Sequence, residues 1–195
     1  STMAHELSHH WFGDLATCET AGDMWLNEGW ARYCEAIFFE NLYNKERANQ
    51  DLRKSHEGVL RLAHIEDNDY WSVANIPHQY TYARQSIYEH GSLATHTLRT
   101  YMGDSLFFHC VTAYLNTYSF TNVNSNTLKT FLSQCSGIDL SDFFNDWVFS
   151  SGYADFSIAD KRIKELGAGN FEVSLNIVQQ LNNAPHYYKN VPVDI

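Results

Sequence analysis

The residues with the clearest chemistry lie near the start of the chain, in the stretch "HELSHHWFGD" at positions 5–14. His5 and His9 are four positions apart, so on a helix they lie on one face, one turn apart, and both can bind one metal ion. Glu6 lies about 100° further round, beside such an ion, which suits a general base acting on water at the metal. His10 points away from the ligand face. Because a solvent-exposed helix can carry the same letters, the motif needs a further ligand.

A catalytic zinc site has three protein ligands and one open position. The metzincin pattern would place glycine and a third histidine where this chain has Phe12 and Leu15, so that class is excluded. Glu28 follows His9 after 18 intervening residues, in the first turn of the next predicted helix. A returning antiparallel helix would bring its carboxylate to the histidine face. The spacing therefore predicts a metal site in which Glu28 joins His5 and His9.

Together, "HELSHHWFGDLAT" and "MWLNEGWARYCE" resemble the aminopeptidase N-like family of zinc peptidases, the gluzincin type whose pattern is HExxH, eighteen residues and then Glu. A thermolysin-type enzyme would have its glutamate one residue later, where this chain has Gly29. The resemblance implies that His5, His9 and Glu28 bind one Zn²⁺ and that Glu6 is the general base.

A second stretch, "SIYEHGSLATHTLR", is similar to the family's Tyr-Glu-Lys-Gly segment at the start of a helix. By this resemblance Tyr88 stabilises the oxyanion of the tetrahedral intermediate, a role that suits a phenol donor near zinc. The chain departs from the family at His10, where Gln is usual, and at His90, where Lys is usual. Neither departure affects the predicted ligands or the role of Tyr88.

The resemblance implies a zinc-dependent aminopeptidase that removes N-terminal residues from peptides. The family binds the substrate's α-amine partly through a Gly-x-Met-Glu-Asn loop upstream of HExxH, and no such string occurs in this sequence. We therefore expect the chain to bind zinc but to have weak or no aminopeptidase turnover. Two alternatives stay open: a related zinc hydrolase with a non-peptide substrate such as an epoxide, and a catalytically silent scaffold. The intact site residues argue against the scaffold.

Several residues near the predicted site have two interpretations. Asp14 and Thr17 either orient a ligating histidine or cap a helix end. Glu35, seven residues after Glu28, either orients a ligand or forms a salt bridge at the edge of the core. The stretch "YTYARQSIY" is expected to line the cleft near Tyr88.

The hydrophobic pattern predicts a mainly α chain with a short β segment at its end. A second helix is expected to begin at an N-cap at Asp23, and 67–82 should be loop; the other predicted helices span 1–12, 45–64, 85–102, 104–118, 125–136 and 139–150. Beyond Gly152 the pattern alternates, and it predicts three strands, "FSIADKRIKEL", "NFEVSLNIVQQ" and "YYKNVPVDI". By the resemblance, 1–152 form the C-terminal part of a thermolysin-like helical catalytic domain. Residues 153–195 then form an antiparallel segment that begins a β-sandwich.

The composition of the chain limits the kinds of partner and environment that we expect for it. The 195 residues have a net charge of −10, which argues against nucleic acid as a partner. No apolar run reaches the ~18 residues of a membrane span, and no leader peptide is visible. The start within the motif suggests a piece of a longer protein. Four widely spaced cysteines predict buried free thiols. Oligomeric state and compartment stay open.

Overall fold

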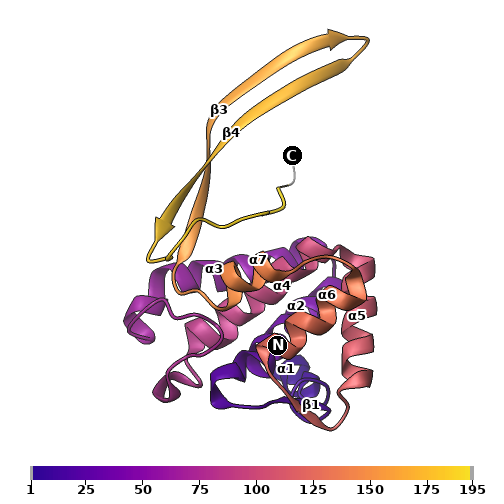
Figure 1. Cartoon of the computed structure of the whole chain (residues 1–195), viewed down its shortest axis with the longest axis vertical. Helices are drawn as coiled ribbons and strands as arrows, with labels where there is room; N and C mark the ends of the chain where they lie inside the picture. Colours follow the sequence, from indigo (N-terminus) through magenta and orange to yellow (C-terminus); the bar gives the residue numbers. More distant parts are fainter. Residues whose placement is uncertain (1, 194–195) are drawn as a thin grey trace.

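The computed structural model describes residues 2–193, which form a helical body with a long two-stranded hairpin projecting from it (Figure 1). The α-helices are α1 (Thr2–Ser8), α2 (Glu28–Leu42), α3 (Lys45–Glu66), α4 (His90–Met102), α5 (Asp104–Thr117), α6 (Ser125–Ser136) and α7 (Ser141–Phe143). Two 3₁₀ helices are η1 (Ala21–Leu26) and η2 (His78–Tyr80), and two short π-helices are η3 (Arg84–Glu89) and η4 (Phe144–Val148). The strands are β1 (Ala16–Cys18), β2 (Thr121–Val123), β3 (Tyr153–Gly167) and β4 (Asn170–Asn182). The predicted mainly α fold followed by a short antiparallel sheet is confirmed.

Helix α2 lies at the centre of the core. Its Trp30 side chain stacks between Phe12, at 4.7 Å between ring centroids, and Phe107, at 5.9 Å. All three rings are buried. Because Phe12 follows α1 and Phe107 belongs to α5, this stack fixes the N-terminal segment against α2 and α5. Burial of aromatic side chains of this size is a major source of stability.

Two helix boundaries near the predicted metal site differ from the prediction. Helix α1 ends at Ser8 rather than at residue 12, and hydrogen-bonded turns continue the chain from there. The helix predicted to start after Asp23 is interrupted, because η1 ends at Leu26 and α2 begins at Glu28. The N-cap of α2 is therefore Asn27, and the prediction for Asp23 is wrong.

Asp23 is used in a long-range contact instead. Its carboxylate accepts hydrogen bonds from the backbone N–H of Ser125, at 2.9 Å, and from the Ser125 hydroxyl, at 2.6 Å. Ser125 is the first residue of α6, whose unpaired N–H groups attract negative charge. The acid that local pattern assigned to its own helix thus stabilises the start of a helix about 100 residues away.

The hairpin β3–β4 pairs antiparallel, with Tyr153 opposite Asn182. The third predicted strand is wrong for the part of it that the structure describes, 187–193, which has no strand pairing; 194–195 lie outside the described residues. This segment binds side chains rather than a strand edge. Gln179 exchanges two hydrogen bonds with the Tyr188 backbone, and Lys189 donates its backbone N–H to Asp146.

Two of the four cysteines form a disulfide, so the prediction of free thiols is wrong for them. Cys110 of α5 and Cys135 of α6 are bonded, while Cys18 and Cys34 are free. The bond joins two neighbouring helices across a separation of 25 residues. Sequence spacing alone does not reveal which helices are neighbours.

Among the described residues, no helix combines enough length with enough apolar character to cross a bilayer.

Candidate metal centre

Three side chains from two elements come together at one point. His5 of α1, His9 in the turn after α1 and Glu28 at the start of α2 offer ligand atoms that lie within 4.8 Å of one another. The Nε2 atom of His5 lies 3.2 Å from Glu28 Oε2, and the Nε2 atom of His9 lies 3.4 Å from the same oxygen. Two imidazoles and one carboxylate are a common donor set of catalytic zinc sites.

The local backbone explains how His9 keeps its orientation although α1 has ended. Its Nδ1 donates a hydrogen bond to the Phe12 carbonyl at 3.0 Å, which leaves Nε2 directed toward Glu28. Gly13 makes this turn feasible, since its φ is +149° and an added Cβ would lie 3.0 Å from the His9 carbonyl oxygen. A ring nitrogen held by a carbonyl fixes the imidazole tautomer for metal binding.

His5 is held from its other side by Glu35. Its Nδ1 lies 3.2 Å from Glu35 Oε1, and Arg32 lies 3.9 Å from the other carboxylate oxygen. Burial disfavours the charged form of Glu35, while the hydrogen bond from His5 and the charge of Arg32 favour it, and the pKa of Glu35 lies below its usual value. Glu35 therefore contacts a predicted ligand and also pairs with Arg32, so the two interpretations of it from the sequence do not exclude each other.

The two carboxylates also change the proton affinity of His5. The hydrogen bond to Glu28, followed by that to Glu35, raises the pKa of His5 to about 9 despite its partial burial. The acids around this imidazole thus favour a positive charge at the cluster. A divalent cation satisfies the same electrostatic demand.

Glu28 is positioned by the residue before it. The Asn27 side chain accepts a hydrogen bond from the backbone N–H of Cys18, at 3.0 Å, and donates one to the Thr17 hydroxyl, at 3.1 Å. These bonds attach the start of α2 to strand β1. Asn27 was not among the site residues predicted from the sequence, although its place directly before the predicted ligand was a usable signal.

Tyr88 lies on η3, a π-helical turn that leads into α4. Its ring stacks on His5 at 6.0 Å between centroids. Burial and then the negative charge of Glu28 raise the pKa of the Tyr88 hydroxyl above its usual value, and the charge of Glu6 contributes in the same direction. Glu6 is exposed on α1. Single π-helical turns are frequent at functional sites.

The remaining residues near the motif are directed elsewhere. His10 is exposed and pairs with Asp14 at 3.3 Å, as expected for a histidine off the ligand face. Thr17 accepts its bond from Asn27. The orienting role considered for Asp14 and Thr17 is filled for His9 by the Phe12 carbonyl.

A cavity of about 550 Å³ opens beside the cluster. It is lined by His5, Arg32, Glu35, Tyr82, Arg84, Tyr88 and Glu89. The expectation that "YTYARQSIY" lines the cleft near Tyr88 agrees with Tyr82 and Arg84 in this wall. The volume is in the usual range for small-molecule sites.

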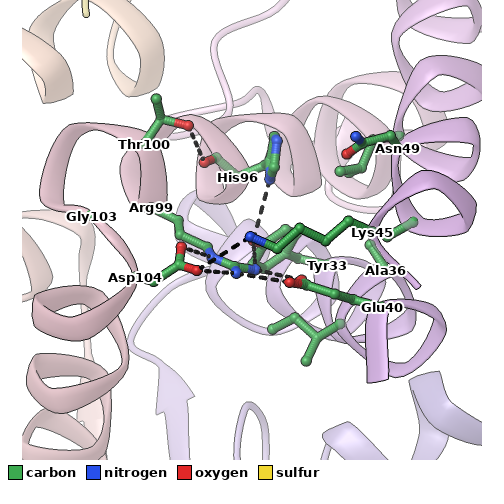
Figure 2. Close-up of a pocket in the computed structure, with 13 residues that line it drawn as sticks. Tyr33, Ala36, Glu40, Lys45, Asn49, His96, Arg99, Thr100, Gly103 and Asp104 are labelled. Carbon is green, nitrogen blue, oxygen red and sulfur yellow. Dashed lines mark hydrogen bonds and ion pairs between the residues drawn. The ribbon is translucent and has the colours of Figure 1, made fainter. Parts of the chain in front are cut away.

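Figure 2 shows a different cavity, of about 330 Å³, between α2, α3, α4 and the start of α5. Buried Arg99 fills its floor and donates to Glu40 and to Asp104, each at 2.7 Å. The Tyr33 hydroxyl lies 3.3 Å from His96 Nδ1. These polar groups therefore bind one another where the four helices meet.

The chain has relatives among known proteins. Residues 1–147 match the peptidase family M1 domain. The chain is 29% identical over 161 residues to aminopeptidase N of Lactococcus lactis subsp. lactis, covering 77% of this chain and 18% of that protein. It is 30% identical over 163 residues to probable aminopeptidase 2 of Sulfurisphaera tokodaii, covering 78% of this chain and 20% of that protein.

A solved structure is similar as well. The M1 zinc metallopeptidase of Deinococcus radiodurans, bound to a Tyr-Ser-Ala substrate, matches with a TM-score of 0.64 and 26% identity. The match covers 75% of this chain and 32% of that one. The chain thus spans about a fifth of the length of the aminopeptidases it matches.

Proposed function

Because the chain belongs to peptidase family M1, we propose that it is the zinc-binding catalytic part of an aminopeptidase that removes N-terminal residues from peptides. His5, His9 and Glu28 would hold the zinc ion, Glu6 would act as general base, and Tyr88 would stabilise the oxyanion. The observation that carries the proposal is the meeting of the two Nε2 atoms at one Glu28 oxygen.

The donor set fits zinc. Imidazole and carboxylate groups suit this borderline-soft ion, and a set of three protein ligands leaves one position for the reaction. When bound, zinc supplies a Lewis acid that activates water and polarises a carbonyl group. The partners of the histidines, Glu35 and the Phe12 carbonyl, hold both rings in the orientation that directs Nε2 inward.

The two other site residues move a proton and stabilise charge. The Glu6 carboxylate takes a proton from the attacking water and passes it to the leaving amine. The Tyr88 hydroxyl donates a hydrogen bond to the oxygen on which charge develops, a contribution worth about 2.7–4 kcal/mol for single donors of this kind. The stacking of Tyr88 on His5 supports this role, because it keeps the phenol beside the ligand cluster.

Peptides are the substrate class that the relatives support. The chain is similar to two aminopeptidases and to a zinc metallopeptidase with a bound tripeptide. The cavity beside His5 and Tyr88 accommodates a ligand of that size.

The test separates metal binding from turnover. The purified chain should bind one equivalent of zinc, measured by metal analysis after dialysis, and should bind leucine hydroxamate only when zinc is present. Glu28→Gln should weaken zinc binding by more than about 100-fold, the upper range for loss of an outer-shell partner. Glu6→Gln should retain zinc and abolish whatever hydrolysis of leucine arylamide the chain has.

His9→Ala and His10→Ala are a matched pair of histidine variants. The first should lose zinc and the second should keep it, since exposed His10 pairs with Asp14 instead. A chain that folds but binds no zinc, or that loses zinc equally in both variants, would overturn the proposed metal centre.

A further inference from the structure

The charged side chains that line the cavity next to the metal centre differ in whether they have a partner within the protein. Arg32 pairs with Asp51 at 2.7 Å and with Glu89 at 3.0 Å, and Glu35 contacts His5. Within residues 2–193, Arg84 has no hydrogen bond or ion pair, and its side chain is exposed. It is thus a cation in the cavity wall with unused donors.

The position of Arg84 relates it to the reaction site. It opens η3, four residues before Tyr88, and lines the same cavity as Tyr88 and His5. Arg84 and Tyr82 also line a neighbouring cavity of about 860 Å³, which reaches Met24 and Cys18. These two side chains therefore form the wall that both cavities share.

We propose that Arg84 binds the carboxylate of a short peptide substrate, in particular its C-terminal carboxylate, and so favours di- and tripeptides with a free C-terminus. This inference rests on the proposed function, because it needs the N-terminal end of the peptide at the metal centre. It adds a specificity residue on the leaving-group side.

Peptide dimensions agree with this arrangement. An extended chain advances about 3.5 Å per residue, so the C-terminal carboxylate of a di- or tripeptide lies about 4–7 Å beyond the scissile carbonyl. That distance is within the reach of an arginine in the wall of the same cavity. Arginine also matches a carboxylate geometrically, since its planar fork donates two parallel hydrogen bonds. Arg32 does not compete for this role, because its donors already bind Asp51, Glu89 and Ser55.

The experiment measures binding to the zinc-loaded chain by calorimetry, in a Glu6→Gln background that keeps the peptides intact. The probes are Ala-Ala-Ala with a free carboxylate, the same peptide as C-terminal amide, and Ala-Asp-Ala amide. The free acid should bind about tenfold more tightly than the amide, as expected for a charge-assisted hydrogen bond at an exposed site. Arg84→Gln should remove this preference, and Arg84→Lys should keep only part of it.

Arg61→Gln is the matched control, because Arg61 is an exposed arginine of α3 outside the cavity lining. It should keep the full preference for the free acid. A preference that survives Arg84→Gln would overturn the proposal, since the carboxylate would then bind elsewhere. If Ala-Asp-Ala amide regains the tenfold advantage and the free acid shows none, the C-terminal assignment is wrong and an acidic side chain is the ligand.

Leucine hydroxamate, which has no carboxylate, separates this inference from the proposed function. If it fails to bind the zinc-loaded chain, the proposed metal centre fails. If it binds wild type and Arg84→Gln equally while the acid and amide peptides do not differ, only the role of Arg84 is refuted.

Discussion

Gly29 and Gly91 bring α2 and α4 into backbone contact directly beside the site. Gly29 follows Glu28, and Gly91 lies three residues after Tyr88. A Cβ at position 29 would lie 2.9 Å from Gly91 Cα and 3.0 Å from the Ile87 carbonyl oxygen. These neighbours are backbone atoms, which cannot turn aside as a flexible side chain does. The crossing therefore sets the distance between the predicted ligand Glu28 and Tyr88.

Gly91→Ala should open this contact. Its Cβ would lie 3.0 Å from Gly29 Cα and 3.3 Å from Trp25 Cβ, whereas ordinary contacts begin at 3.4 Å. The helices must then separate by about 0.4 Å, the difference between the 3.0 Å and 3.4 Å distances, and overpacking of this kind typically lowers the unfolding free energy by about 1–3 kcal/mol. The double variant Gly29→Ala, Gly91→Ala should lose less unfolding free energy than the sum of the losses in the two single variants, because both substitutions widen the same gap between the helices.

The assay is urea unfolding followed by tryptophan fluorescence, together with hydroxamate affinity at saturating zinc. Gly22→Ala is the control, since its Cβ would lie 3.4 Å from Asn75 Cα, an ordinary contact, and it should change stability by less than about 0.5 kcal/mol. Hydroxamate binding should weaken in Gly91→Ala because Tyr88 moves away from the ligand cluster. If Gly91→Ala unfolds at the same urea concentration as Gly22→Ala, the crossing does not hold the helices at this distance.

Three further predictions concern stability. Burial lowers the pKa of His90 from 6.5 to about 4, so as the pH drops the unfolded chain takes up a proton at this residue before the folded chain does. The unfolding free energy should therefore fall by at most about 3 kcal/mol between about pH 6.5 and pH 4. Urea midpoints measured over this pH range should show the decrease in the wild type and lose it in His90→Asn. The double variant Cys110→Ala, Cys135→Ala should have an unfolding free energy about 3 kcal/mol lower, because the disulfide closes a loop of 25 residues. When the wild type is unfolded without reductant, a thiol reagent should label two of its four cysteines. Arg99→Met should lower the unfolding free energy by about 2 kcal/mol or more, since two carboxylates lose their buried partner; an unchanged melting temperature would contradict this.

Local sequence predicted much of this molecule because periodic spacing carries its own geometry. His5 and His9 are on one side since four residues make about one turn, and Glu28 begins the next helix as expected. The helices α5 and α6 match their predicted ranges to within a residue, since glycine and asparagine mark their ends. These features depend on neighbours within a few positions.

Predictions failed where a distant partner decided the outcome. Asp23 has the composition of an N-cap, yet Ser125 binds its carboxylate. The segment around Tyr188 alternates like a strand, yet Gln179 and Asp146 satisfy its backbone. A polar group that could bind a residue nearby in the sequence binds a distant one instead when packing of the folded chain brings that residue close.

For the site, sequence alone determined which side chains could bind a metal and at what spacing. Only the tertiary structure decided how they are held: Glu35 behind His5, the Phe12 carbonyl behind His9, and a glycine crossing that brings α4 against α2. Among the residues that the structure describes, Arg84 also has no partner in the wall of the same cavity. The reason is physical, because ligand type and helical period are local properties. Orientation, burial and charge pairing depend on residues that only folding brings together.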